Sequence, residues 1–277
     1  MNKKPTITFV GAGAIAEAII SGLVGKGVMD PSQIIVTNRS NEKRLRALCQ
    51  TYQVRSEEHP STGVRGADII VLAFKPSDVT DAIHSIKDQT DPSQVFVSVV
   101  AGVPTDTITR LLGHAAPIIR TMPNTGAAVG ASATALSLGV HATGRHLEIA
   151  CSLLKTIGRV TIVEEKDLDA VTGLSGSGPA YIYYLVEAME TAAEHIGLNP
   201  VVAKELILQT IIGAALTLRA SPEDPACHYR RVMSPGGTTE AGFAVLEDYR
   251  FQEAVAACIE RATERSREMG AVFEHVR

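Results

Sequence analysis

The feature that most constrains this chain is a glycine-rich segment that follows its first apolar run. Residues Thr6–Val10 predict a buried strand, and the apolar spacing over Ala14–Lys26 predicts a helix. The segment GAGAIA, which joins this strand to the helix and includes the first residues of the helix, fits the pattern G-x-G-x-x-A. Its first glycine allows a tight turn, its second lets a pyrophosphate approach the backbone, and its small last residue lets helix and strand pack closely. We therefore predict a dinucleotide site at a helix N-terminus, formed by Gly11, Ala12, Gly13, Ala14, Ile15 and Ala16.

The first half of the chain continues as an alternation of short apolar runs and helical patterns. Further strands are predicted at Gln33–Thr37, Asp68–Ala73, Val95–Val100, Ile118–Thr121, Gly130–Leu138 and Arg159–Val163. Helices are predicted between them at Glu42–Tyr52, Asp78–Lys87, Asp106–Leu112 and His146–Ile157. Such alternation indicates a parallel sheet, and the nearly continuous apolar runs suit strands covered on both faces. We expect an α/β, doubly wound Rossmann domain over residues 1–164.

The second half, residues 165–277, predicts an all-α domain. Long helical patterns occupy Pro179–Gly197, Pro200–Arg219, Thr239–Asp248 and Phe251–Gly270, and a short charged link, SPEDPACHYRR, precedes the third. Asn199 suits an N-cap before Pro200. The helix Pro200–Arg219 is apolar almost all round, as a helix buried on several sides is. Since about 110 residues form a small core, we expect these helices to build a homodimer.

Composition excludes several classes of protein. The chain has 45% hydrophobic residues and a formal net charge of -4, which does not suit a disordered chain. It carries no basic stripe for nucleic acid. Its four cysteines are scattered without metal-ligand spacing, so free thiols and no metal are expected. No secretory leader is evident, and charges or glycines break the apolar stretches before about 18 residues. A cytoplasmic protein without a membrane partner is predicted.

The end of the second predicted strand bears on the cofactor. An NAD-selective site usually carries Asp or Glu there, to bind the ribose 2′-hydroxyl. This chain has Asn38, Arg39 and Ser40 instead, which can donate to a 2′-phosphate. We therefore expect NADP(H), with NAD(H) as the less preferred cofactor. The alternative is that Arg39 only begins the next helix in solvent.

Other loops follow strands at the same predicted sheet edge, namely AFKP, VAGV and MPNT. They place Ala73, Lys75, Pro76, Ala101 and Asn124 beside a nicotinamide pocket, although each loop could be turn chemistry alone. In the helical half, Thr172–Pro179 and Ser234–Thr239 are glycine-rich and precede helices. Such segments can bind a carboxylate through backbone N–H groups, or they can serve only capping and close packing.

The ordered set GAGAIA, NRS, FKP, VVAGV, MPNT, VTGLSGSGPAY and SPGGTT resembles the pyrroline-5-carboxylate reductases over essentially the whole chain. The last two motifs are the most diagnostic. The resemblance implies NAD(P)H-dependent reduction of 1-pyrroline-5-carboxylate to L-proline, the last step of proline biosynthesis. It also implies a Rossmann domain and a helical domain that interlocks with a partner's, forming dimers and often higher oligomers.

The resemblance also assigns roles to individual residues. It places Ser234, Gly237, Thr238 and Thr239 at the substrate carboxylate, and Thr172 and Glu165 near the substrate ring. Two departures stand out: Gly126 replaces the usual proline after MPNT, and Arg231 stands near a position that is often Asn. The first could loosen its loop, and the second puts one substrate contact in doubt.

An iminium accepts hydride better than a neutral imine, so we expect the substrate to bind protonated and Thr172 to orient it. Glu165 could accept a hydrogen bond from the ring nitrogen, or it could be a solvated carboxylate at a helix start. Rival interpretations are a related NADP-dependent imine or β-hydroxyacid reductase and a non-catalytic NADP-binding regulator. A hydroxyacid enzyme needs a lysine on the long interdomain helix, and the segment from Pro179 to Glu194 has none.

Overall fold

The computed structural model describes residues 5–273, and it divides into two compact units. The first unit comprises Met1–Pro179 and Glu260–Arg277, and the second comprises Ala180–Ile259. Each unit is described by itself. The predicted boundary between residues 164 and 165 falls inside the first unit, and as a boundary between functional domains it stays a prediction.

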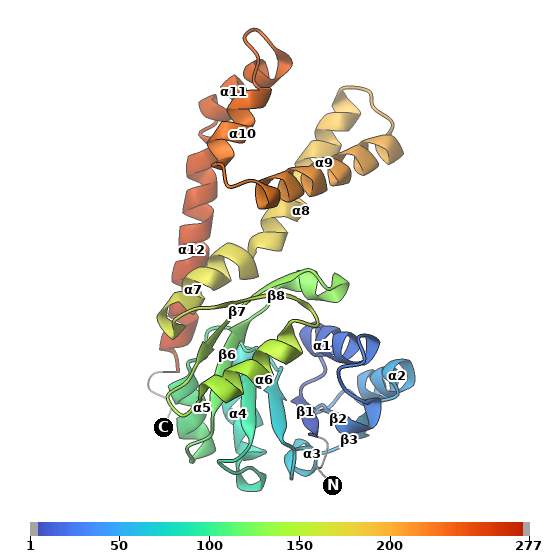
Figure 1. Ribbon diagram of the computed structural model, residues 1–277, viewed down its shortest axis with the longest axis vertical. Coiled ribbons are helices and arrows are strands. Elements are labelled where there is room, and N and C mark those ends of the chain that lie inside the picture. Colours follow the sequence, from blue (N-terminus) through green and yellow to red (C-terminus); the bar gives the residue numbers. More distant parts are fainter. Residues whose placement is uncertain (1–4, 274–277) are drawn as a thin grey trace. The chain divides into compact units, whose positions relative to one another are not determined.

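The first unit is built on an eight-stranded sheet with the order β3-β2-β1-β4-β5-β6-β7-β8 (Figure 1). All neighbouring strands are parallel except β6 and β7, which are antiparallel. The order reverses between β1 and β4, and such a reversal opens a crevice at the carboxyl ends of the strands. The strands are β1 (Ile7–Val10), β2 (Ile34–Thr37), β3 (Arg55–Glu57), β4 (Ile69–Leu72), β5 (Val95–Ser98), β6 (Ile118–Met122), β7 (Ser132–Leu138) and β8 (Gly158–Ile162).

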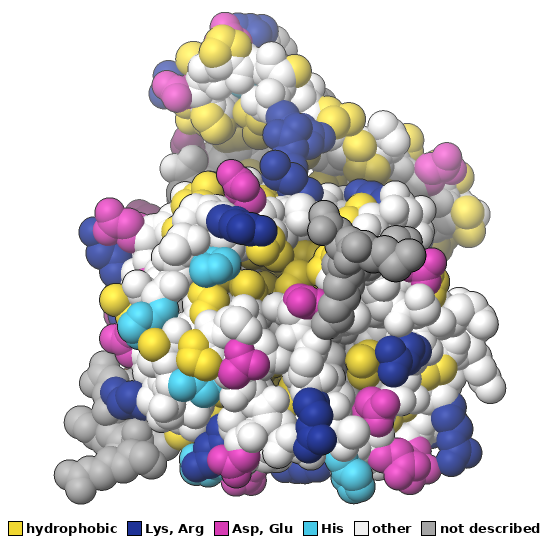
Figure 2. All heavy atoms as spheres, turned by 60° about the horizontal axis from the view of Figure 1, so that its bottom comes forward, with side chains coloured by type: hydrophobic (Ala, Val, Ile, Leu, Met, Phe, Trp, Pro, Cys, Tyr) yellow, Lys and Arg dark blue, Asp and Glu magenta, His cyan; other side chains and the backbone are white. Residues whose placement is uncertain are grey.

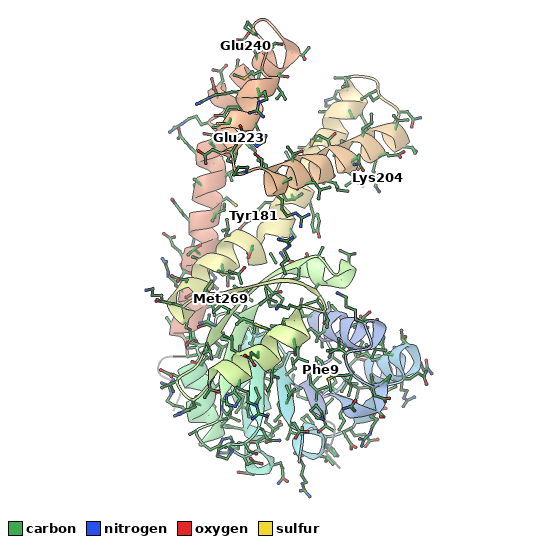
Figure 3. All side chains as sticks on the ribbon, in the orientation of Figure 1. Phe9, Tyr181, Lys204, Glu223, Glu240 and Met269 are labelled. Atoms are coloured by element: carbon green, nitrogen blue, oxygen red, sulfur yellow. The ribbon has the colours of Figure 1, made fainter. Side chains whose placement is uncertain are left out.

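Helices cover both faces of this sheet because side chains alternate along each strand. Ile7 and Phe9 of β1 join one apolar cluster with α1 (Ala14–Gly25), α2 (Glu42–Tyr52) and α6 (Gly144–Leu154). Ile70 and Leu72 of β4 join the other cluster with α3 (Pro60–Val64), α4 (Val79–His84) and α5 (Thr105–Leu112). Figure 3 labels Phe9 within the sheet unit. The predicted doubly wound α/β fold is confirmed.

The sequence missed β3 and α3, and both omissions have physical reasons. The strand β3 has only three residues, and two of them are exposed, so it carries no apolar run. The helix α3 has five residues and begins at a proline. Both elements are too short for a periodic pattern to emerge.

The chain enters its helical half through a continuous helical stretch. It begins with α7 (Leu168–Val171), continues as a π-helical turn over Thr172–Gly176, and leads into α8 (Gly178–His195). The expectation that Thr172–Pro179 offers free N–H groups at a helix start is therefore wrong for its first residues. Residues Thr172–Gly176 lie inside the helical stretch, and the N–H of Ser177, which follows them, donates to the Thr172 carbonyl over 2.8 Å.

The second unit contains the rest of α8, then α9 (Pro200–Ala220), α10 (Pro225–Val232), α11 (Thr238–Asp248) and the start of α12 (Phe251–Ala271). Asn199 caps α9 as predicted, accepting from the Val201 and Val202 N–H groups. The segment expected as a charged link contains α10, so that prediction is wrong. Asp224 at its N-cap and Pro225 in its first turn provide a helix start despite the polar sequence.

The apolar surface of the second unit is largely exposed. Its buried cluster consists of Ala193, Ala203 and Ile207. Helix α9 is long and apolar enough to cross a membrane by length and composition, and only 11% of its most apolar window is buried. We predicted that charges or glycines break the apolar stretches before about 18 residues. For α9 this prediction is wrong. On the face shown in Figure 2, basic and acidic side chains are interspersed.

The end of α12 belongs to the first unit. Met269, labelled in Figure 3, approaches Gly102, where a Cβ atom would lie 3.5 Å from the Met269 Cβ. The Ser266 hydroxyl donates to Asp169 Oδ1 over 2.7 Å. Arg110 of α5 donates to the Phe273 carbonyl over 2.9 Å. These contacts fix the last turns of α12 to the sheet unit.

Candidate functional site

The glycine-rich segment forms the tight turn between β1 and α1. Gly11 has φ of +111°, and a Cβ atom there would lie 2.2 Å from the Ala73 carbonyl oxygen. Its N–H donates to the Thr37 carbonyl over 3.0 Å. Gly13 is the N-cap of α1 and makes no side-chain capping bond. The turn therefore requires glycine at its first position and leaves the positive end of α1 facing the crevice.

A pocket of about 630 Å³ lies at this edge of the sheet. Its volume is typical of small-molecule and cofactor sites. Most of the predicted cofactor residues line it, namely Gly11, Ala12, Gly13, Ala14, Ile15, Ala16, Asn38, Arg39, Ser40, Ala73 and Lys75. The structure thus brings together residues that follow β1, β2 and β4, as expected for a doubly wound sheet.

The residues after β2 form a turn at one end of this pocket. Asn38 Oδ1 accepts from the backbone N–H groups of Ser40 and Asn41, at 3.1 and 3.0 Å. Its oxygen therefore holds the turn, and what Asn38 can offer a ligand is its amide N–H donors. Arg39 lies 3.6 Å from a carboxylate oxygen of Asp78, and its side chain is 70% exposed.

Several further residues line the pocket and were not predicted from the sequence. They are Val10, Glu58, His59, Pro60, Phe74, Asp78, Asp81, Ala82, Ser85 and Val99. Glu58, His59 and Pro60 follow β3, the strand that gave no sequence signal. Asp78, Asp81, Ala82 and Ser85 come from the turn before α4, from α4 itself and from the residue after it. Recognising β3 as a parallel strand could have placed its following loop at the same edge.

Arg44 supports the glycine turn from α2 and was also missed. Its Nε–H donates to the Ala12 carbonyl over 2.9 Å, and its guanidinium contacts Glu17 of α1 over 2.5 Å. Tyr52 donates to the other Glu17 oxygen over 3.3 Å. The turn is thus held by a network between α1 and α2 that no local motif announces.

Three predicted cofactor residues, Pro76, Ala101 and Asn124, are not among the residues that line this pocket. Pro76 begins a short 3-10 turn, and Ala101 precedes Gly102, which lies close to the last turns of α12. Asn124 Nδ2 donates to the Ser175 carbonyl over 3.0 Å, and its Oδ1 accepts from the Gly126 N–H over 3.1 Å. Asn124 therefore ties the loop after β6 to the π-helical turn.

Gly126 does not loosen this loop. A Cβ atom there would lie 2.8 Å from the Ala131 carbonyl oxygen, and the Ala131 N–H donates to the Gly126 carbonyl over 2.9 Å. The residue thus sits at a close backbone approach inside a hydrogen-bonded turn. The expectation of a looser loop is wrong because glycine permits this approach.

Glu165 begins a short 3-10 turn and its side chain is 29% exposed, but its carboxylate also has partners. Its two carboxylate oxygens accept from the Thr105 N–H over 2.8 Å and from the Thr105 hydroxyl over 2.7 Å. Arg120 on β6, whose side chain is 6% exposed, lies 3.5 Å from Glu165 and 3.4 Å from Asp169. Glu165 thereby holds the first residue of α5 and shares a buried cation with Asp169.

Thr172 begins the π-helical turn. Its hydroxyl donates to the Leu168 carbonyl over 2.8 Å, so the lone pairs of its oxygen are what it can offer a ligand. A Cβ atom on Gly176, at the end of the turn, would lie 2.5 Å from Met122 Cε. Single π-helical turns are frequent at functional sites. This turn is packed against the same β6 loop that Asn124 holds.

Ser234, Gly237, Thr238 and Thr239 belong to the second unit, where Gly237 caps α11. The Gly237 N–H donates to the Ser234 carbonyl over 2.9 Å, and the Gly236 N–H donates to Glu240 over 2.7 Å. Figure 3 labels Glu240 and Glu223, on α11 and before α10 respectively. The segment forms a compact turn at a helix start, as the sequence predicts.

Arg231, one of the two departures, pairs with Glu223 through contacts of 2.8 and 2.9 Å to both carboxylate oxygens. These hydrogen bonds and the guanidinium charge hold the pKa of Glu223 below its usual value. Arg231 is therefore engaged just before the SPGGTT segment. An Asn in its place could not supply this charge.

Comparisons with known proteins agree with the two halves of the chain. Residues 165–269 match the family model described as pyrroline-5-carboxylate reductase dimerisation. Residues 6–102 match the model described as NADP oxidoreductase, coenzyme F420-dependent. The chain is 46% identical to pyrroline-5-carboxylate reductase 2 of Bacillus subtilis over 267 residues, which cover 96% of each protein.

Solved structures show the same similarity. A pyrroline-5-carboxylate reductase from Coxiella burnetii is 35% identical, with a TM-score of 0.86, over 96% of this chain and 98% of that one. The Plasmodium falciparum pyrroline carboxylate reductase with NADP bound is 25% identical, with a TM-score of 0.89, over 97% and 99% of the respective chains. The chain described here belongs to the pyrroline-5-carboxylate reductase family.

Proposed function

We propose that this protein is an NADPH-dependent oxidoreductase that reduces 1-pyrroline-5-carboxylate to L-proline, the last step of proline biosynthesis. The observation that carries the proposal is full-length similarity to reductases of this name, together with a pocket built on the glycine turn. The family's two diagnostic motifs, VTGLSGSGPAY and SPGGTT, are intact in the same chain.

The residues that line the pocket fit NADP(H). The N-terminus of α1 would hold the pyrophosphate over Gly11–Ala16, because helix N-termini favour anions. Asn38, Arg39 and Ser40 would donate to the adenosine 2′-phosphate. Ala73 and Lys75 would lie toward the nicotinamide, with Pro76, Ala101 and Asn124 shaping the loops around them. NAD(H) would bind with lower preference.

We propose roles for the substrate-binding residues as well. Ser234, Gly237, Thr238 and Thr239 would hold the substrate carboxylate through hydroxyls and N–H groups at the start of α11. The Thr172 oxygen would accept a hydrogen bond from the ring N–H of the protonated imine. For Glu165 the contacts with Thr105 and Arg120 support a positioning role, in which it fixes α5 and β6.

When bound, the dihydronicotinamide supplies a hydride to the C=N carbon. The hydride electrons form the new C–H bond, the C=N π pair moves to nitrogen, and the iminium charge is neutralised. The nitrogen keeps the proton with which it entered. The protein's contribution is then to hold the protonated ring in position.

Quaternary structure and location complete the proposal. We propose a homodimer formed through the C-terminal helices, able to assemble further, in the cytoplasm and without a membrane or nucleic-acid partner. The exposed apolar surface of α9 supports an association of chains. If α9 instead entered a membrane, the protein would cosediment with lipid vesicles, whereas a dimer would stay in the supernatant.

Steady-state oxidation of NADPH with added 1-pyrroline-5-carboxylate tests the activity. The expected result is turnover that forms proline, with NADPH favoured over NADH. Tight NADPH binding without turnover would support a regulator. NADPH oxidation with only a 3-oxo acid or a different imine would support a related reductase of the β-hydroxyacid or imine type. Helix α8 carries no lysine, and the first lysine after it in the sequence, Lys204, lies on α9 (Figure 3), which disfavours the hydroxyacid chemistry.

A further inference from the structure

The cofactor pocket is lined by more carboxylates than Lys and Arg side chains. Two cationic side chains, Arg39 and Lys75, line it together with three carboxylates, Glu58, Asp78 and Asp81. A dinucleotide with a 2′-phosphate brings two more negative charges than one without it to this end of the pocket. The surrounding carboxylates therefore oppose the cofactor that Arg39 would select.

Arg39 already has an anionic partner. Its Nη1 lies 3.6 Å from Asp78 Oδ1, across the crevice from the turn after β2 to the start of α4. The Arg39 side chain is 70% exposed and that of Asp78 is 35% exposed, so solvent screens the pair and its attraction is modest. A 2′-phosphate must share or displace this carboxylate to bind the guanidinium.

The position of Asp78 in its own element strengthens the case. It stands at the N-cap of α4, where Asp normally accepts from the backbone of the first turn, yet its side chain makes no capping hydrogen bond. The carboxylate reaches Arg39 instead. Its local structural role is small, so its effect on Arg39 can be separated from its effect on folding.

We propose that Asp78 is a specificity-determining residue that limits the preference for NADPH over NADH, acting through Arg39 as a positioning residue. With a 2′-hydroxyl cofactor, Arg39 stays paired with Asp78. With a 2′-phosphate cofactor, Arg39 turns to the phosphate and the Asp78 carboxylate is left near it. The inference rests on the proposed function only in that the pocket binds a nicotinamide dinucleotide.

The test compares D78N with the matched variant D81N. Each variant removes one carboxylate from the pocket, at the N-cap of α4 for D78N and in its first turn for D81N. Of the two carboxylates, Asp78 is the one paired with Arg39. For D78N we expect KM for NADPH to fall by about threefold to fivefold, the range expected for an exposed ion pair, and KM for NADH to change less than that. D78E, which keeps the charge, should behave like the unchanged protein, and D81N should show a smaller effect.

Binding of two small probes gives a readout that does not need turnover. Calorimetric titration with 2′,5′-ADP and with 5′-AMP isolates the 2′-phosphate, and D78N should tighten binding of the former alone. In an R39Q background the D78N effect on 2′,5′-ADP should shrink, because the two residues act on one interaction. Equal effects of D78N and D81N, or equal tightening of both probes, would overturn the proposal. These titrations decide it even if no imine is reduced, so the failure of each proposal is distinguishable.

Discussion

At the scale of single residues, the hydroxyl of Thr172 is the sharpest proposal about the substrate. Its proton is committed to the Leu168 carbonyl, so its oxygen acts toward a ligand as an acceptor. We expect Thr172→Ala to lower kcat/KM for the imine by about tenfold or more, the cost of losing a hydrogen bond to a charged group. Thr172→Ser should retain most of the activity.

Ser175→Ala is the matched control for that substitution. The Ser175 hydroxyl makes the same kind of bond, to the Val171 carbonyl over 3.2 Å, in the same π-helical turn. Its loss should disturb the turn equally but leave kcat/KM within about twofold, because no hydrogen bond to a charged group is removed. If Thr172→Ala kept full activity, the orienting role of Thr172 would be wrong.

His114, before β6, makes folding stability depend on pH. Its Nε2 lies 3.0 Å from the Thr90 hydroxyl, and its Nδ1 is buried with no hydrogen-bond partner among the described residues. Burial lowers its pKa from the usual 6.5, against the opposing charge of Asp91. The unfolded chain therefore binds the proton more readily, and stability is lost as pH falls through about 6.5 toward the lower folded pKa.

Denaturant unfolding from about pH 8 to about pH 5 measures this effect. His114→Gln should show a smaller loss of unfolding free energy on acidification, because the group that takes up the proton is gone. The two proteins should differ least in this slope near pH 8, where the imidazole is neutral in both states. Parallel profiles over the whole range would contradict the assignment to His114.

The site residues predicted from the sequence are placed by neighbouring elements of the chain. Those that were not predicted are placed by tertiary contacts. Asn38 and Arg39 follow a strand and could be placed by counting from the glycine turn. Arg44 and Asp78 act across the fold, on Ala12 and on Arg39, through contacts that appear only once α2 and α4 are packed. Their sequence neighbours resemble any polar helix surface, so no motif could identify them.

At the scale of elements, we expect the two glycines of the β1–α1 turn to have different roles. Gly11 would be needed for folding of the turn, and Gly13 for approach of the cofactor. Gly11 needs a positive φ and has no room for a Cβ atom, whereas Gly13 has an extended backbone and its nearest such contact is 4.0 Å. We expect Gly11→Ala to cost about 2–4 kcal/mol of unfolding free energy, from backbone strain and overpacking. Gly13→Ala should change stability by less than about 1 kcal/mol.

Cofactor binding then distinguishes the second variant. A methyl group on Gly13 would stand at the start of α1, where a pyrophosphate approaches the backbone, so we expect about tenfold weaker NADPH binding. Thermal unfolding and fluorescence titration of NADPH measure the two effects. A stable Gly11→Ala protein, or unchanged NADPH affinity in Gly13→Ala, would contradict this division of roles.

Elements with a strong apolar period could be predicted from the sequence, and those held by context could not. The buried strands β1, β2 and β4 appear with their ends shifted by a residue or two, and α2 has the predicted bounds. By contrast, α10 has a polar sequence and depends on Asp224 and Pro225 for its start. In the π-helical turn, Gly176 packs against Met122, a contact that no local pattern encodes.

At the scale of the whole molecule, the two halves of the chain bury their apolar residues unequally. The sheet unit encloses two clusters, whereas the second unit has a small one and leaves much of α9 exposed. Ile212 and Leu216, one turn apart on α9, are 50% and 49% exposed. Apolar surfaces of this kind mark contacts with another chain. The apolar character of α9 is evident in the sequence, and its place in a dimer interface stays a prediction.

We therefore expect the purified protein to sediment at micromolar concentration with a mass of at least twice 29.4 kDa. Ile212→Glu combined with Leu216→Glu should shift it to monomers or insoluble material, because burying two unpaired carboxylates in an interface is costly. Arg145→Glu is the control, because it introduces a glutamate at the exposed start of α6 in the sheet unit. It should leave the mass in solution unchanged. A monodisperse monomer of the unchanged protein would refute the dimer, and a double variant that still dimerises would place the interface on another face of these helices.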